Sequence, residues 1–174
     1  IGVAMLIDDT FKDKPQNYLN YLKKFGFNDN FNFQIFGSSK PQIKNYLDST
    51  WSKVSLPWIA HGYELMLTPL HTLTFYNAIA NRGYYIEPQI VKKVKNANEK
   101  ILEFAKSSPK KIATKNSINT MKLLLEGVVE NGTADNIKHS NYKIAGKTGT
   151  AKKVYEGRYI NRYYTSFSGF FPSE

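Results

Sequence analysis

The chain of 174 residues is long enough for one domain, or for part of a larger one. Its 41% apolar content can build a core and it has no cysteine, which excludes wholesale disorder, disulfide frameworks, cysteine zinc sites and thiol nucleophiles. The net charge of +10 predicts a solvated lysine-rich face, or at most an anionic surface partner, rather than a nucleic-acid site, because only three of the 24 basic residues are arginine.

The apolar run at the start of the chain, Ile1–Ile7, stops at Asp8–Asp9. It is too short for a signal peptide, and no other run reaches the roughly 20 residues of a membrane span. The first residue is isoleucine rather than methionine. We therefore expect a segment of a longer protein.

The first predicted helix opens at 13–15, where Pro15 suits the first turn, and ends at Gly26. Its apolar positions have helical spacing and comprise Tyr18, Leu19, Leu22 and Phe25. Residues 28–58 are rich in Asn, Ser, Gly and Pro and are punctuated by aromatic residues. This segment therefore predicts a long irregular excursion attached to a core.

Thr68–Pro69 predicts a helix start, with threonine as the N-cap and proline at the first helical position. The helix should close at 81–83. Its buried face is expected to comprise Leu70, Leu73, Tyr76, Ile79 and Ala80. Residues 84–95 contain Pro88, which favours an edge strand or an extended arm, and residues 106–115 predict a charged loop.

Ser117 is predicted to cap a further helix that ends at Asn131–Gly132. Its apolar stripe is expected to comprise Ile118, Met121, Leu124, Leu125 and Val128. Two strands follow, over 142–151 and 164–171, with a turn at 155–158. This order of elements predicts an α+β domain in which helices pack against an antiparallel sheet.

The stretch from Ala145 to Ala151 is the part of the sequence that suggests chemistry. The hydroxyls of Thr148 and Thr150 share one face of the predicted strand, Gly149 leaves room for another backbone, and Lys147 adds a cation. Such a strand can hold a carboxylate on an extended peptide that docks along its edge. A Lys-Thr-Gly triplet alone is equally compatible with a glycine-rich edge strand, and it is not a phosphate loop, because no glycine stands five residues before the lysine.

Further blocks surround this stretch in a specific order. They are Gly62–Tyr63, Thr68–Leu70, 78–83, Val128–Ala134, Tyr142–Ala151 and Ser166–Pro172. In order and spacing these blocks resemble the C-terminal part of the transpeptidase domain of penicillin-binding proteins, over residues 1–174. The run Leu73–Asn81 resembles the monofunctional, division-type (class B) members of that family.

The resemblance implies a peptidoglycan D,D-transpeptidase with a penicillin-binding protein and serine β-lactamase-like fold, incomplete at both ends. It implies that Lys147 and Thr150 are catalytic, the lysine through its charge and the threonine through a backbone N–H in the oxyanion hole. It also implies that Thr148, Gly149 and Thr150 bind the substrate carboxylate. Neither a cofactor nor a metal is implied, and His61, His71 and His139 lack the spacing of metal ligands.

The partners that the resemblance implies are peptidoglycan stem peptides ending in D-Ala-D-Ala and the β-lactam antibiotics that mimic them. For the full-length protein, it also implies division-complex membrane proteins. It implies no nucleic acid. The expected location is the periplasmic side of the cell inner membrane, through an N-terminal anchor outside this chain. Septal cell-wall synthesis is the expected process.

The family uses three motifs, Ser-x-x-Lys, Ser-x-Asn and Lys-Thr/Ser-Gly, of which only the third is convincing here. We therefore expect residues 1–174 to form a partial domain that lacks the nucleophile segment and the last strand and helix, and to be inactive alone. Literal matches to the other motifs begin at Ser107, Ser108, Ser117 and Ser140. They are expected to be decoys, because the true nucleophile begins a buried helix that brings its lysine alongside.

Two alternatives remain open. The chain could belong to a non-catalytic sensor domain that binds penicillin or peptidoglycan, or to a serine β-lactamase. The Val128–Ala134 block and the phenylalanine-rich excursion favour the large transpeptidases over the β-lactamase.

Overall fold

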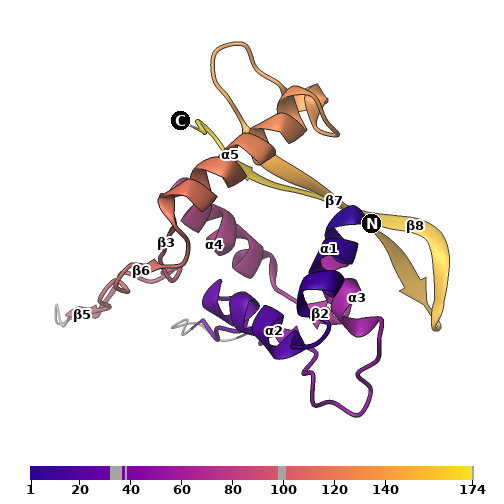
Figure 1. Ribbon diagram of the computed structural model, residues 1–174. Coiled ribbons are helices and arrows are strands. Elements are labelled where there is room, and N and C mark those ends of the chain that lie inside the picture. Colours follow the sequence, from indigo (N-terminus) through magenta and orange to yellow (C-terminus); the bar gives the residue numbers. More distant parts are fainter. Residues whose placement is uncertain (32–36, 38, 98–100, 174) are drawn as a thin grey trace. The chain divides into compact units, whose positions relative to one another are not determined.

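The computed structural model describes residues 1–31, 37, 39–97 and 101–173 (Figure 1). It divides into two compact units, Ile1–Thr74 with Tyr85–Pro109, and Phe75–Tyr84 with Lys110–Glu174. Helices and antiparallel strands make the chain α+β, which confirms the predicted fold class. Among the described residues, no helix combines the length and the apolar character that a membrane crossing requires.

The first unit is mainly helical. Its elements are α1 (Gly2–Phe11), α2 (Pro15–Lys24), β1 (Gln42–Ile43), α3 (Ser55–His61), β2 (Leu65–Met66), β4 (Lys93–Lys95) and β5 (Ile101–Glu103). Strand β1 pairs with β2 and β4 with β5, both antiparallel. Helix α2 begins at Pro15 as predicted, and Gly26 follows it with φ +83°, a conformation that glycine adopts without strain.

Two features of this unit correct the expectations. Helix α1 was not expected from the short apolar run, and the segment 28–58 is not wholly irregular, because it contains β1 and the first residues of α3. Both differences arise from packing. Helix α1 packs against α2 and α3, and a core forms around Leu19, Leu22 and Ile59, with Trp51 and Ile43 packed against it.

Helix α4 (Pro69–Ala80) contributes residues to both units and begins at Pro69 as predicted. Its buried side chains differ from the expected face, however. His71, Thr74, Ala78 and Ile79 are buried, whereas Leu73 is 55% exposed. A histidine can be buried here because both ring nitrogens have partners, Thr68 Oγ1 at 2.7 Å and the Asp29 carbonyl at 2.8 Å, and because the ring stacks on Phe31.

The second unit is built from the end of α4 and the elements that follow Pro109. These are β6 (Lys110–Lys111), α5 (Lys115–Glu130), a short 3₁₀ helix (Asp135–Ile137), β7 (Ala145–Tyr155) and β8 (Arg158–Phe170), while β3 (Tyr84–Tyr85) follows α4. Helix α5 packs on β7. The core comprises Ile79, Ile118, Leu125 and Ala145, with Phe170 packed against it.

The start of α5 lies three residues earlier than predicted. Thr114 is the N-cap, because its Oγ1 accepts the Ser117 backbone N–H at 3.2 Å, and Ser117 occupies the third helical position. The buried stripe also differs, since Leu124 is 62% exposed while Val129 is fully buried. The predicted end of the helix at Asn131 is confirmed.

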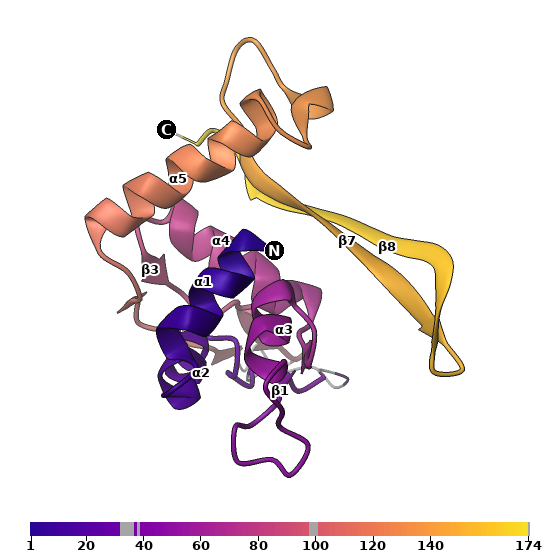
Figure 2. The ribbon, with the colours of Figure 1, turned by 45° about the vertical axis from the view of Figure 1, so that its right-hand side comes forward.

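Strands β7 and β8 form a long antiparallel hairpin that Figure 2 shows as a twisted ribbon. The predicted strand pair is therefore confirmed, although β7 begins three residues later than expected and both strands extend further toward the turn. The turn is Glu156–Gly157, with φ of 48° and 74°, and two positive φ values match the twist of the flanking strands.

Candidate functional site

The Lys-Thr-Gly-Thr motif lies on β7, near the base of the hairpin. Lys147 is opposite Ser168, Gly149 is opposite Ser166, and Thr150 is opposite Thr165. Because side chains alternate along a strand, Thr148 and Thr150 project on one face and Lys147 on the other. The predicted pairing of the two threonines on one face is therefore consistent with the register.

The ammonium of Lys147 folds back toward the strand. Its Nζ donates a hydrogen bond to the Thr148 carbonyl at 2.9 Å and lies 3.5 Å from Thr148 Oγ1. The side chain is exposed, and within the described residues no carboxylate lies within 4.0 Å of it. The structure therefore brings the cation to the threonine without neutralising its charge.

Thr148 has a second partner that the sequence analysis did not assign. Thr133 Oγ1 lies 2.7 Å from Thr148 Oγ1. Thr133 follows the C-terminus of α5, and its neighbour Ala134 is buried and donates its N–H to the Val128 carbonyl at 3.1 Å. The only sequence signal for Thr133 was its place in the Gly-Thr-Ala block of the family resemblance.

The room that Gly149 is expected to leave for the backbone of a docking peptide stays a prediction, and within the hairpin itself a close backbone approach is found at Gly169. A Cβ built on Gly149 would meet only the Ser166 hydroxyl, at 2.7 Å, within a 4 Å radius. A Cβ on Gly169 would instead lie 2.5 Å from the Ala145 carbonyl oxygen, and Gly169 faces Gly146 across the ladder. The two strands therefore approach so closely at Gly169 that a side chain there would clash with β7.

One edge of β7 is open. In the part of the chain that the structure describes, β7 pairs with β8 alone. Its other edge can therefore accept main-chain hydrogen bonds from an extended peptide. Thr150, on the same strand, has an exposed side chain that such a peptide could reach.

The literal matches to the nucleophile motif lack its geometry. Ser107 accepts the Glu87 backbone N–H at 2.9 Å in a non-helical segment, and Ser108 is exposed beside it. Ser140 is also outside any helix, and the ammonium of Lys143, three residues on, lies 3.7 Å from a Glu126 carboxylate oxygen. None of these serines therefore begins a helix that would bring the motif lysine beside its hydroxyl.

The described residues contain no cluster of three or more His, Asp or Glu side chains able to hold a metal. His71 packs in the first unit, where its Nε2–H donates to the Asp29 carbonyl and its Nδ1 faces the Thr68 hydroxyl. His139 stacks on Tyr142 at 4.1 Å between ring centroids, and His61 is exposed. These are packing and surface roles.

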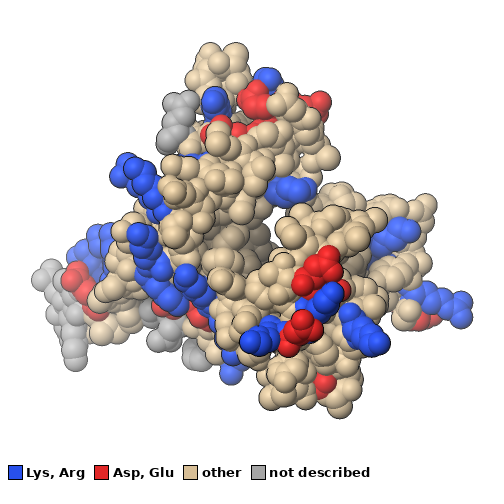
Figure 3. All heavy atoms as spheres, viewed as in Figure 1, with Lys and Arg blue, Asp and Glu red and all other residues tan. Residues whose placement is uncertain are grey.

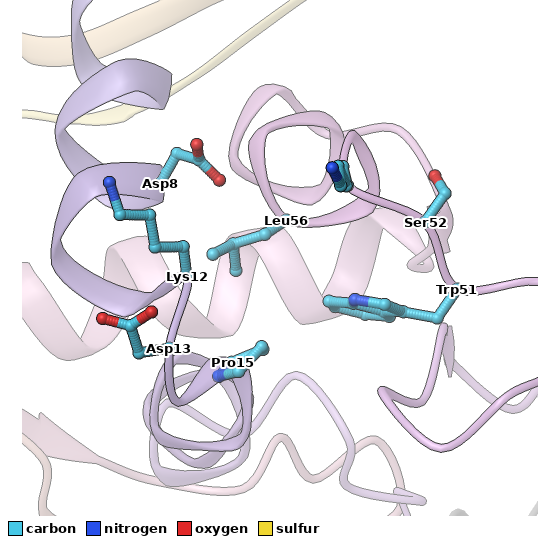
Figure 4. Close-up of a pocket in the computed structure, with 8 residues that line it drawn as sticks. Asp8, Lys12, Asp13, Pro15, Trp51, Ser52 and Leu56 are labelled. Carbon is cyan, nitrogen blue, oxygen red and sulfur yellow. The ribbon is translucent and has the colours of Figure 1, made fainter.

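A cavity of about 620 Å³ lies in the first unit (Figure 4). Figure 4 shows Asp8 of α1 and Lys12, which follows that helix, on one side, with Leu56 and the Trp51 ring facing them. It contains both acidic and basic side chains, and none of the motif residues lines it. Its composition does not favour a particular chemistry.

Comparisons with known proteins place the chain among penicillin-binding proteins. The family model "Penicillin binding protein transpeptidase domain" matches residues 8–174. Stage V sporulation protein D of Bacillus subtilis (strain 168) is 28% identical over 91% of this chain and 25% of its own length. Peptidoglycan D,D-transpeptidase FtsI of Buchnera aphidicola subsp. Baizongia pistaciae is 32% identical over 88% of this chain and 26% of its own length.

The fold is also that of a solved relative. Penicillin-binding protein 3 from Mycobacterium tuberculosis, complexed with aztreonam, superposes with a TM-score of 0.81 and 25% identity, over 91% of this chain and 37% of that one. The chain spans about a quarter of the length of the curated relatives first matched. With a family match over nearly all of its residues and the Lys-Thr-Gly strand in place, the chain belongs to the penicillin-binding protein transpeptidase domain family.

Proposed function

We propose that this chain forms the substrate-carboxylate side of the active site in a serine-type peptidoglycan D,D-transpeptidase. The observation that carries the proposal is the arrangement on β7, where the Lys147 ammonium and the Thr148 hydroxyl meet beside an open strand edge. Family membership supports it, and so does the name peptidoglycan D,D-transpeptidase carried by several relatives.

Each motif residue has a role in this proposal. Lys147 supplies a positive field for the substrate carboxylate and for the proton network of the nucleophile. Thr148 and Thr150 donate hydrogen bonds from their hydroxyls to the carboxylate, and the absent side chain of Gly149 leaves clearance. The Thr150 backbone N–H is one of two donors to the oxyanion that develops during acyl transfer.

The reaction proceeds in two acyl transfers. A serine hydroxyl attacks the penultimate D-Ala carbonyl, the peptide C–N bond breaks, and D-Ala leaves with the proton from the serine. An amine of a neighbouring stem peptide then attacks the ester, which forms the cross-link and returns the serine hydroxyl. A β-lactam takes the place of the first substrate and stops at the ester.

We propose that the nucleophilic serine, its lysine and the Ser-x-Asn motif come from a part of the protein outside residues 1–174, so that the chain is a partial domain. The chain matches only 37% of the solved relative, and the literal Ser-x-x-Lys sequences here are not helical. This segment alone is expected to be inactive.

We also propose that the full-length protein lies on the extracytoplasmic side of the inner membrane and that its anchor is outside residues 1–174. Its proposed role is septal cell-wall synthesis, with division-complex membrane proteins as partners. Relatives named FtsI and stage V sporulation protein D support this setting. Stem peptides and β-lactams are the proposed ligands, and the solved complexes of a relative with aztreonam and ampicillin support the second.

The test uses the full-length protein and a fluorescent penicillin. We expect the wild type to be labelled at a serine outside this chain, and the Lys147→Ala variant to lose most of the labelling. Lys152→Ala is the matched control, because Lys152 is an exposed lysine on the same strand. Equal labelling of both variants would contradict the assignment of Lys147 to the active site.

A second measurement separates the alternatives. A transpeptidase releases D-Ala from a stem pentapeptide and forms a cross-linked product when an amine acceptor is present. A sensor domain is labelled without releasing D-Ala, and a β-lactamase hydrolyses penicillin with repeated turnover. Either of the last two results contradicts the proposed reaction.

A further inference from the structure

A basic cavity lies beside the N-terminal half of α5, in the second unit. Its volume is about 420 Å³, within the range of roughly 300–1,000 Å³ that small-molecule sites occupy. Four of its lining side chains are cations, namely Arg82, Lys111, Lys115 and Lys122. We call it the α5 cavity. None of the motif residues on β7 lines it.

Separate segments deliver these cations to one place. Lys115 and Lys122 are seven residues apart on α5, and a separation of seven places two side chains on the same face of a helix. Arg82 comes from the turn after α4, where its own φ is +56°. Lys111 lies on β6. Figure 3 shows basic side chains on the side of the molecule where α5 begins.

The cavity is lined by one aliphatic side chain as well as by polar ones. Ile118 lines it and is only 5% exposed, because it also belongs to the core of the unit. Tyr84 and Asn119 add a phenol and an amide that can donate hydrogen bonds. A ligand in this cavity would therefore meet both directed donors and net positive charge.

The four cations are not neutralised by the protein. Within the described residues, no carboxylate lies within 4.0 Å of any of them, whereas Lys138 and Lys143 of the same unit each have a glutamate partner. Lys115 also stands in the first turn of α5, where the helix dipole disfavours a cation.

We propose that the α5 cavity binds a multiply charged phosphate group. One carboxylate would offset one of the four charges, whereas a diphosphate or a phosphate headgroup presents several acceptor oxygens to Arg82 and the lysines at once. Guanidinium suits phosphate because its planar fork donates two parallel hydrogen bonds, and ammonium groups bind phosphate as point charges. The ligand is a free di- or polyphosphate or the headgroup of an anionic lipid, which share this chemistry.

The test is a chemical footprint on the full-length protein, which needs no substitution. Lysine acetylation is followed by mass spectrometry with inorganic pyrophosphate, and separately with the protein reconstituted in phosphatidylglycerol or in phosphatidylcholine vesicles. We expect the ligand to slow acetylation of Lys111, Lys115 and Lys122 by about fivefold or more, and of the hairpin residue Lys152 by less than about twofold. Protection that is equal at Lys152, or absent in every arm, would overturn the proposal.

The arms identify the source of the phosphate. Protection by pyrophosphate alone assigns a free ligand, and protection by phosphatidylglycerol but not phosphatidylcholine assigns a lipid headgroup. An Arg82→Gln variant should lose most of the protection at Lys115 and Lys122, since the guanidinium is not itself acetylated. Arg162→Gln on β8 is the control with the same charge change. Penicillin labelling should be unchanged in both variants, so this test fails or succeeds independently of the proposed transpeptidase activity.

Discussion

The side-chain hydroxyls of Thr133 and Thr148 lie 2.7 Å apart, although the two residues are fifteen positions apart in the sequence. Buried Ala134 and its hydrogen bond to Val128 hold Thr133 at the end of α5. A hydroxyl has one proton to donate and two lone pairs to accept with. If Thr133 donates to Thr148, the Thr148 proton remains available for a substrate carboxylate. Thr133 is then a positioning residue for the lysine strand.

Replacing Thr133 by valine in the full-length protein removes this hydrogen bond and keeps the shape of the side chain. We expect the second-order rate of acylation by penicillin to fall by about 2- to 12-fold, which corresponds to roughly 0.5–1.5 kcal/mol for one neutral hydrogen bond. Thr133→Ser should restore the rate, because it restores the hydroxyl. Thr120→Val, at an exposed position of α5, is the control. No change in Thr133→Val would mean that Thr148 needs no partner.

Thr148→Ala and Lys147→Ala should differ in their effect on acylation. A hydroxyl that binds a charged carboxylate contributes roughly 1.5–3 kcal/mol, or about 10- to 150-fold in rate, and the Thr150 hydroxyl can replace part of it. Lys152 is too far away to replace Lys147, because it is five residues further along the strand. The acylation rate of each variant, with circular dichroism to confirm folding, checks this order. A folded Lys147→Ala protein that reacts at the wild-type rate would contradict it.

Two glycine-to-alanine substitutions should have opposite effects on stability. In Gly169→Ala the new methyl group meets the Ala145 carbonyl oxygen at 2.5 Å, so the strands must separate, at a cost of roughly 1–3 kcal/mol. In Gly127→Ala the methyl group meets nothing within 4 Å, and alanine favours the α5 helix by roughly 0.5–1 kcal/mol. Thermal unfolding of the two variants gives the comparison, and a stabilised Gly169→Ala protein would show that the hairpin base is not tightly packed.

The ion pair between Lys44 and Glu64 should make the first unit sensitive to acid. Burial by itself raises the pKa of Glu64, but the hydrogen bond from Lys44 at 2.6 Å and its charge lower the pKa below the usual value overall. A lowered pKa means that the ionised carboxylate stabilises the fold above the unfolded-state pKa of about 4.3, and that this stability is lost as the pH falls through the folded-state pKa.

The measurement is the difference in unfolding temperature between the wild type and Glu64→Gln. We expect the wild type to be the more stable at pH 7, and the difference to shrink below about pH 5. A difference that stays constant down to about pH 3 would mean that the pair contributes nothing to folding.

The literal Ser-x-x-Lys sequences should not react with penicillin. Ser107 is held by the Glu87 backbone, and the lysine that follows Ser140 lies next to Glu126. After reaction of the full-length protein, peptide mapping should find the penicilloyl group on a serine outside this chain. A mass shift on Ser107, Ser108 or Ser140 would show that the active site is made differently.

Local sequence signals were sufficient for the elements whose ends carry specific residues. Pro15 and Gly26 bound α2, Pro69 begins α4, and Asn131 caps the end of α5. The hairpin followed from two apolar runs and the Gly157 turn. These signals act over a few residues, through backbone conformations that proline and glycine restrict or permit.

Burial on the helices was predicted less well. Leu73 and Leu124 were expected inside and are largely exposed, while His71 was not expected in the buried face of α4. The spacing of apolar residues along a helix gives the width of its apolar stripe, but the helix or strand that packs against it decides which edge of the stripe is buried. Helix α1, with a largely exposed Val3 and a buried Ala4, owes its packing to α2 and α3 rather than to its own pattern.

The sequence by itself determined the family, the α+β class and the strand on which Lys147 and the threonines stand, because these depend on short motifs and on alternation along one strand. Only the tertiary structure brought Thr133 to Thr148 and four cations to the α5 cavity. Residues far apart in the chain meet only when helices and strands pack, and that packing depends on the shape of all the surfaces that are buried together.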